Sequence, residues 1–183
     1  MKRLALPLII LAFALVGGGA GFLLGGYVYD NPPPPIGIQP VGIGELVPDF
    51  ERVDSDGKTR RLSEWRGSRV VVNYWASWCP PCIEEMPMLD AYAAAHADRG
   101  LVVIGIAEDD PDSVRDFLSR HPVAYPILIG TGTGGASVQL GNSRNVLPYT
   151  ALIGADGRLL DRRAGVLDEA ALDAWLNRVD DAN

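Results

Sequence analysis

The hydrophobic pattern divides the chain into one long uncharged run near the N-terminus and a downstream region in which strand and helix patterns alternate. Short apolar runs rich in β-branched and aromatic residues predict buried strands. These strands are 70–75, 101–107 and 125–129. Helical composition or spacing predicts helices at 80–98, 112–119 and 168–179, the last of them amphipathic. Alternating strands and helices are typical of an α/β sheet with parallel strands.

An Asp-Gly turn marks a hairpin at each end of this alternating region. The first hairpin joins 49–53 to 59–62, and the second joins 149–153 to 158–164. The first predicts a β-hairpin at the entry to the domain. The second predicts an antiparallel edge on the otherwise parallel sheet.

The uncharged run extends from Leu4 to Tyr29 and follows Lys2 and Arg3. A run of this length is sufficient to cross a bilayer, which takes roughly 20 residues. The positive-inside rule then places the N-terminus in the cytoplasm and the remainder on the outer side. We expect residues 1–29 to be an uncleaved transmembrane anchor, with a cleaved signal peptide as the alternative.

A segment rich in proline and glycine follows the predicted anchor. Residues 32–35 are four consecutive prolines, which favour an extended polyproline II spacer. We therefore assign residues 30–45 to a linker and residues 46–183 to a single domain.

The composition excludes several classes of function. A formal net charge of −7 without a basic cluster argues against binding of nucleic acid. The chain has two cysteines, Cys79 and Cys82, which are too few for a disulfide-stapled scaffold and lack further ligands at zinc-site spacing. We expect no metal site and no cofactor, and we interpret the Cys-x-x-Cys pair as redox-active.

The position of this pair has a chemical consequence. Cys79-Pro80-Pro81-Cys82 directly follows a predicted buried strand and opens a predicted helix. Free N–H groups and the positive end of the helix dipole stabilise a thiolate at such a position. We expect Cys79 to be the exposed attacking thiolate and Cys82, one turn further on, to be the resolving thiol.

Three parts of the sequence carry a family resemblance. They are Val47–Phe50 with Trp65–Gly67, Asn73–Cys82 followed by Glu85-Met86-Pro87, and Leu147–Thr150. Over almost all of the chain after the linker, these motifs resemble the TlpA/ResA-like branch of the thioredoxin superfamily. The resemblance implies an α/β, thioredoxin-like fold with an N-terminal β-hairpin extension, preceded by one transmembrane helix.

The same resemblance assigns roles to individual residues. Asn73 matches a position where thioredoxins carry a buried Asp; an amide cannot take a proton, so we expect its replacement to act through packing. The resemblance instead makes Glu85 catalytic, a proton-exchanging carboxylate beside Cys82, with a solvated surface acid as the alternative. Pro148 matches a proline held in cis opposite the redox pair. We assign substrate binding to Trp78, Pro80, Pro81, Leu147 and Pro148.

The resemblance also implies a function, because many members of this branch are exported and reduce disulfides. We expect a protein-disulfide reductase of the bacterial cytoplasmic membrane, with its domain on the periplasmic or outer side. Its substrates are expected to be disulfide-bearing exported proteins, such as apocytochrome c or copper-site assembly proteins, and its electron donor a membrane thiol protein. An oxidising disulfide donor and a Cu(I) carrier are the alternatives.

Two other interpretations of the sequence fail. Peroxiredoxins share the entry hairpin but carry Thr or Ser three residues before their attacking cysteine, where this chain has Ala76 before Cys79. Residues 130–135 satisfy the G-x-G-x-x-G pattern of dinucleotide sites, yet 136–140 is too short for the helix that such a site requires. We interpret the glycine-rich segment as a flexible insertion.

Overall fold

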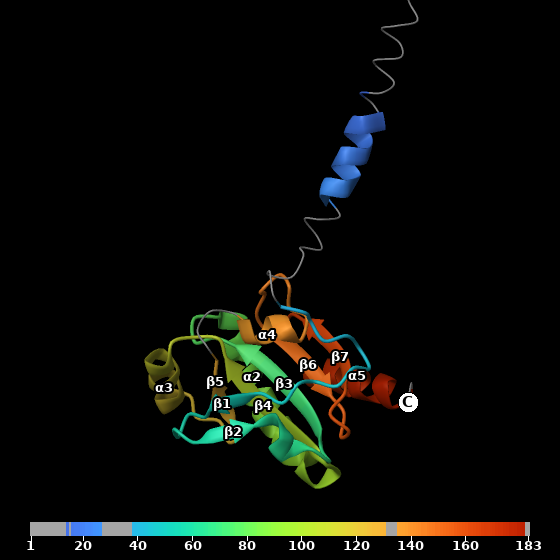
Figure 1. Cartoon of the computed structure of the whole chain (residues 1–183). Helices are drawn as coiled ribbons and strands as arrows, with labels where there is room; N and C mark the ends of the chain where they lie inside the picture. The colour runs from blue at the N-terminus through green and yellow to red at the C-terminus, as the bar shows by residue number, and fades with distance from the viewer. Residues whose placement is uncertain (1–13, 15, 27–37, 131–134, 182–183) are drawn as a thin grey trace, which may run out of the picture.

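In the computed structural model, which describes residues 14, 16–26, 38–130 and 135–181, a five-stranded mixed sheet lies at the centre of the domain (Figure 1). The strands are β3 (Arg69–Trp75), β4 (Leu101–Ala107), β5 (Ile127–Ile129), β6 (Tyr149–Ile153) and β7 (Leu159–Ala164). Their order is β5-β4-β3-β6-β7. β3, β4 and β5 pair in parallel, whereas β6 and β7 pair antiparallel. The predicted parallel part and antiparallel edge are both confirmed.

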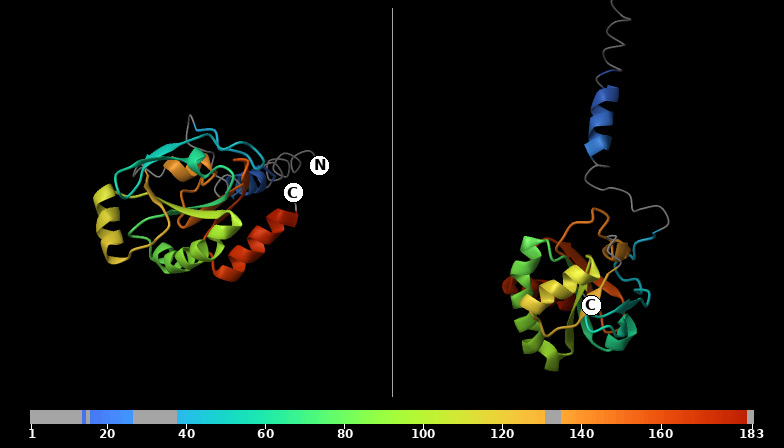
Figure 2. Two further views of the ribbon diagram at one scale, coloured as in Figure 1. Left: turned by 90° about the horizontal axis from the view of Figure 1, so that it is seen from below. Right: turned by 90° about the vertical axis from the view of Figure 1, so that its left-hand side faces the viewer.

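Three helices pack on one face of this sheet, as the two views of Figure 2 show. They are α2 (Pro80–His96), α3 (Pro111–Arg120) and α5 (Glu169–Asp181). Parallel neighbours require crossover connections, and α2 and α3 provide those between β3, β4 and β5. α2 ends at His96, slightly earlier than predicted, and continues as the short 3-10 helix η2 (Ala97–Arg99). Gly100 then adopts a left-handed conformation with φ +70°, which ends the helical segment.

The opposite face is covered by shorter elements. The predicted entry hairpin is present as β1 (Glu51–Val53) and β2 (Thr59–Arg61), followed by the 3-10 helix η1 (Leu62–Trp65). The five-residue helix α4 (Gly135–Gln139) was not predicted. Its sequence alone is too short to be a stable helix. Tertiary contacts supply the stability, because Ala136 and Val138 are buried and the Ser137 N–H donates to Glu108 Oε1 at 2.8 Å.

Strand β3 contributes side chains to the cores on both faces of the sheet. Val71 and Trp75 point into the core beneath the three helices. Val70, Val72 and Tyr74 point into the core beneath the hairpin and α4. This alternation explains why the sequence of β3 is continuously apolar from Val70 onward, apart from Asn73.

The last residues of the predicted linker contact the domain. The Val41 N–H donates to the Gln139 carbonyl at 2.8 Å, and Val41 itself is buried. The Gly44 N–H donates to the Leu159 carbonyl at 2.7 Å, and the Leu159 N–H donates to the Glu45 carbonyl at 2.9 Å. The contacts of the domain therefore extend upstream of residue 46, along the edge of the sheet formed by β7.

The predicted N-terminal anchor, residues 1–29, lies largely outside the described residues. Residues 16–26 are helical, and within the described ranges no helix is long and apolar enough to cross a membrane. Residues 131–134 of the glycine-rich segment also lie outside the described residues.

Candidate active site

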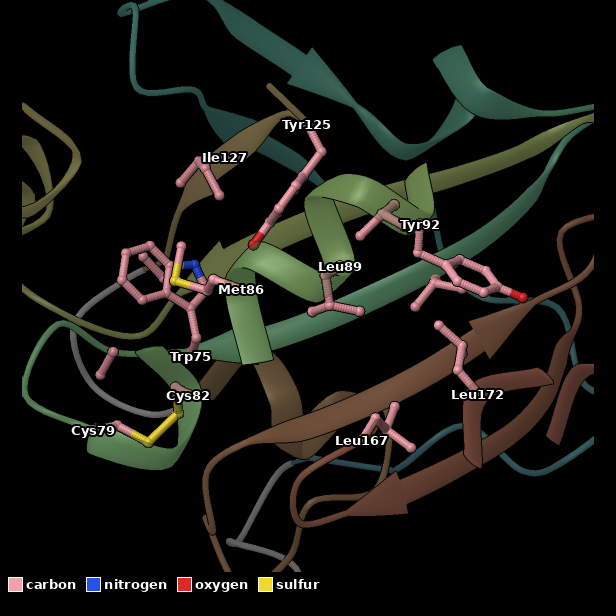
Figure 3. Close-up of a cluster of buried hydrophobic side chains, with 14 of the residues drawn as sticks. Trp75, Cys79, Cys82, Met86, Leu89, Tyr92, Tyr125, Ile127, Leu167 and Leu172 are labelled. Atoms are coloured by element: carbon pink, nitrogen blue, oxygen red, sulfur yellow. A yellow bond between two sulfur atoms is a disulfide. The ribbon is translucent and has the colours of Figure 1, made fainter. Parts of the chain in front are cut away.

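The two cysteines lie where the central strand ends and α2 begins. Cys79 is the N-cap residue of α2, with extended backbone (φ −100°, ψ 97°), and Pro80 and Pro81 occupy the first helical turn. Proline is tolerated there because the first N–H groups of a helix have no intrahelical acceptor. Cys79 and Cys82 form a disulfide with an S–S distance of 2.07 Å (Figure 3).

The exposure of the pair differs from the expectation in one respect. Cys79 was expected to be exposed, but only 4% of it is accessible in the disulfide state, because its sulfur is bonded to Cys82 at the margin of the core. Cys82 is completely buried, so Cys79 remains the more accessible of the two. Trp78 is 67% exposed beside them, whereas Trp75 is fully buried. An incoming substrate therefore meets Trp78 and the Cys79 side of the disulfide first.

A carboxylate missed in the sequence fixes the loop before Cys79. Asp109 Oδ2 accepts hydrogen bonds from the Ser77 N–H at 3.0 Å and from the Ser77 hydroxyl. The Cys79 N–H donates to the Ala76 carbonyl at 3.1 Å and closes a tight turn. Asp109 follows β4, and β4 pairs with β3. This pairing brings Asp109 beside the loop that follows β3, and the sequence alone does not show it.

Glu85 is the buried carboxylate of the site. It is 2% exposed, so the alternative of a solvated surface acid is wrong, whereas its neighbour Glu84 is exposed. Glu85 Oε1 accepts from Asn73 Nδ2 at 2.7 Å, and Oε2 accepts from the Leu167 N–H at 2.9 Å. Burial raises the pKa of Glu85, and these two hydrogen bonds oppose the rise.

The contact between Asn73 and Glu85 adds to the expectation about Asn73, whose replacement was expected to act mainly through packing. Asn73 also donates directly to the carboxylate, and this hydrogen bond opposes the rise in the pKa of Glu85. Asn73 points from β3 to the face of the sheet on which α2 carries Glu85. No spacing in the sequence indicated that these two side chains are in contact.

The remaining predicted substrate-binding residues lie around the redox pair or beside the strand that leads to it. The Leu147–Pro148 peptide bond is cis, as the resemblance implied. Tyr149 pairs with Tyr74, which brings Pro148 to the end of β3 from which the cysteine loop departs. Pro148 is buried and Leu147 is half-buried. Pro80 is exposed and Pro81 half-buried at the start of α2.

The arrangement defines a chemical class. The structure has a thioredoxin-like sheet, a Cys-x-x-Cys disulfide at the N-terminus of a helix, and a buried carboxylate one turn after the second cysteine. Among the described residues, no group of three His, Cys, Asp or Glu side chains is arranged to hold a metal ion. The site is suited to thiol–disulfide exchange, in which a thiolate attacks a disulfide sulfur.

Comparison with known proteins identifies the family. Residues 43–162 match the AhpC/TSA family, and the chain belongs to it. It is 26% identical to the thiol-disulfide oxidoreductase ResA of Bacillus anthracis, over 98% of this chain and 99% of the relative. It is 30% identical to the ResA protein of Geobacillus kaustophilus, over 76% of this chain and 79% of that one.

The solved structures agree with this relationship. The exposed lipoprotein thioredoxin Etrx1 of Streptococcus pneumoniae aligns with a TM-score of 0.62 and 26% identity, covering 72% of this chain and 99% of that one. The thioredoxin-like fold and the suspected relationship to ResA are thus confirmed. The chain is an enzyme of the thiol–disulfide oxidoreductase class. It lacks the peroxiredoxin motif, because Ala76 occupies the position where peroxiredoxins carry Thr or Ser.

Proposed function

We propose that this enzyme reduces disulfides in exported proteins, with Cys79 attacking and Cys82 resolving. The observation that carries the proposal is the burial of Cys82 and Glu85 behind the more accessible Cys79, next to the exposed Trp78. A buried second cysteine cannot meet a protein substrate directly, so attack falls to Cys79.

The proposed reaction has two exchange steps. The Cys79 thiolate attacks one substrate sulfur, forms a mixed disulfide and releases the other substrate sulfur, which takes up a proton. Cys82 then loses its proton and attacks the Cys79 sulfur, which releases the second substrate sulfur as a thiolate that takes up a proton, and the enzyme is left oxidised. A thiol protein of the membrane donates two electrons and two protons to restore the dithiol. Glu85 accepts the Cys82 proton as a general base.

The reduction potential tests the proposed direction of electron flow. We expect a value nearer to the roughly −270 mV of thioredoxin than to the roughly −120 mV of strongly oxidising disulfide donors. Equilibration of the full chain with graded dithiothreitol buffers, followed by alkylation and mass analysis, measures it. A value near the oxidising end of this range would instead support a disulfide donor. Stoichiometric binding of Cu(I) by a protein that fails to reduce insulin would support a carrier.

We also propose that the domain lies on the outer side of the bacterial cytoplasmic membrane and remains attached through residues 1–29. The uncharged run from Leu4 to Tyr29, which follows Lys2 and Arg3, supports this topology. Mass analysis of the membrane fraction is expected to find the intact N-terminus. Protease added to spheroplasts is expected to remove the domain. A soluble mature chain that begins near Gly21 would show cleavage of a signal peptide instead.

A further inference from the structure

The contact between Asn73 and Glu85 leaves one polar atom without a partner. Asn73 is fully buried, and its Nδ2 donates to Glu85 Oε1 at 2.7 Å and to Thr150 Oγ1 at 3.3 Å. Its Oδ1 is buried and has no hydrogen-bond partner among the described residues. Buried polar side-chain atoms are nearly always bonded. Here no donor among the described residues fixes Oδ1 in this orientation of the amide.

We infer that the Asn73 amide has two positions, each of which serves one protonation state of Glu85. When Glu85 is ionised, Nδ2 faces the carboxylate. When Glu85 is protonated, the amide turns about its Cβ–Cγ bond, and Oδ1 accepts a hydrogen bond from the carboxylic acid. Asn73 is then a positioning residue, because it acts through Glu85. Its relevance to turnover rests on the proposed function of Glu85.

The chemistry of the three side chains permits this exchange. The two ends of an amide have nearly the same size, so turning it requires no displacement of its neighbours. The Thr150 hydroxyl both donates and accepts, so it can bond either end. In each state, the amide end between Glu85 and Thr150 makes two hydrogen bonds, and the other end has no partner among the described residues. Glu85 can therefore gain a proton without leaving a buried acid hydrogen unpaired.

The other groups around Glu85 favour Oε1 as the atom that carries the proton. The Leu167 N–H is a fixed donor to Oε2, and a backbone amide cannot become an acceptor there. Two further groups face Glu85. One is Cys82, one turn earlier in α2. The other is Tyr125, which precedes β5 and whose pKa is raised in part by the charge of Glu85. Within the described residues, Glu85 forms no salt bridge. No cation of the described part of the chain therefore holds this carboxylate permanently ionised.

A nuclear magnetic resonance titration tests the inference directly. The oxidised full-length protein, labelled with ¹³C and ¹⁵N in detergent micelles, is titrated from about pH 4 to about pH 9, the range in which a raised Glu titrates. We expect the side-chain nitrogen of Asn73 and the carboxyl carbon of Glu85 to shift with one common midpoint, and the nuclear Overhauser contact between the Asn73 amide protons and Thr150 to weaken below that midpoint, because Nδ2 then turns away from Thr150. An Asn73 resonance that stays constant, or an Asn73–Thr150 contact that keeps its strength while Glu85 titrates, would overturn the inference.

Asn142 is the control within the same sample. It is also buried, but its Nδ2 donates to Ser137 Oγ at 3.0 Å and to the Val146 carbonyl at 2.8 Å. Its Oδ1 accepts from the Val146 N–H at 3.0 Å, so both ends are held. Its resonance is expected to stay constant across the pH range. A shift of Asn142 in parallel with Asn73 would indicate a general change in the fold and would also overturn the inference.

Glu85→Gln gives an independent result. Its amide can accept from Leu167 and donate to Asn73 Oδ1, so it imitates the protonated acid. We expect the Asn73 resonance to stay at its low-pH wild-type position at every pH. A resonance at the high-pH position would contradict the inference, and if this variant fails to fold, the wild-type titration still decides. Because insulin reduction is measured separately, failure of this inference leaves the proposed function to be judged on its own test.

Discussion

Replacing Cys79 with Ser abolishes the reduction of insulin disulfides, down to the rate without enzyme. A serine hydroxyl is not ionised near neutral pH, so the variant has no nucleophile at the more accessible position of the pair. Cys79 is the N-cap residue of α2, where the helix terminus stabilises a thiolate. The reduced wild-type enzyme is therefore expected to be alkylated at Cys79 at a lower pH than an ordinary thiol.

Cys82→Ser is the matched control, because it makes the same chemical change one helical turn away. This variant keeps the attacking thiol but has no group to resolve the mixed disulfide. It is expected to turn over no insulin and to accumulate a covalent complex, which non-reducing electrophoresis and mass analysis detect. Cys79→Ser is expected to form no such complex. Equal alkylation rates of both cysteines in the reduced wild-type protein, or a complex trapped on Cys82, would contradict the assigned roles.

Glu85→Gln slows insulin reduction by roughly 10²–10⁴-fold, the usual contribution of general acid–base catalysis. The amide occupies almost the same volume as the carboxylate but cannot take the Cys82 proton. The pH dependence of alkylation should also change, because a buried carboxylate beside two sulfurs resists ionising together with them. Stopped-flow measurement of the rate against pH provides both readouts.

Glu84→Gln is the control for this prediction, because Glu84 has the same chemistry on the exposed side of the helix. It is expected to leave the rate and the pH profile unchanged. If Glu85→Gln behaves in the same way as Glu84→Gln, the proposed role of Glu85 is wrong.

The stability of the protein provides a separate check on Glu85. Burial is the main cause of its raised pKa, so the folded state binds the proton more strongly than the unfolded state does. The stability that Glu85 contributes is fully present below its unfolded pKa of about 4.5 and is lost as the pH rises through the folded pKa. Urea unfolding of Glu85→Gln is therefore expected to show a smaller loss of stability over this pH range than the wild type.

The sequence by itself determined the elements that have a strong local pattern. The β-branched run before Cys79 predicted a buried strand, and β4 has the same bounds as its prediction, 101–107. Asp-Gly turns located both hairpins, and the spacing of the cysteines located the redox pair at the start of α2. These features depend on residues close together in the chain, so periodicity and turn chemistry are sufficient to predict them.

Only the tertiary structure decided which side chains surround the disulfide. Glu85 contacts Asn73, 12 residues earlier, and Leu167, 82 residues later, and Asp109 reaches Ser77 across 32 residues. An acid on a helix has the same local pattern whether it is buried or solvated, so periodicity could not separate Glu84 from Glu85, and only the family resemblance singled out Glu85. Glu85 is buried because the sheet and the segment before α5 cover its side of α2. This burial raises the pKa of Glu85.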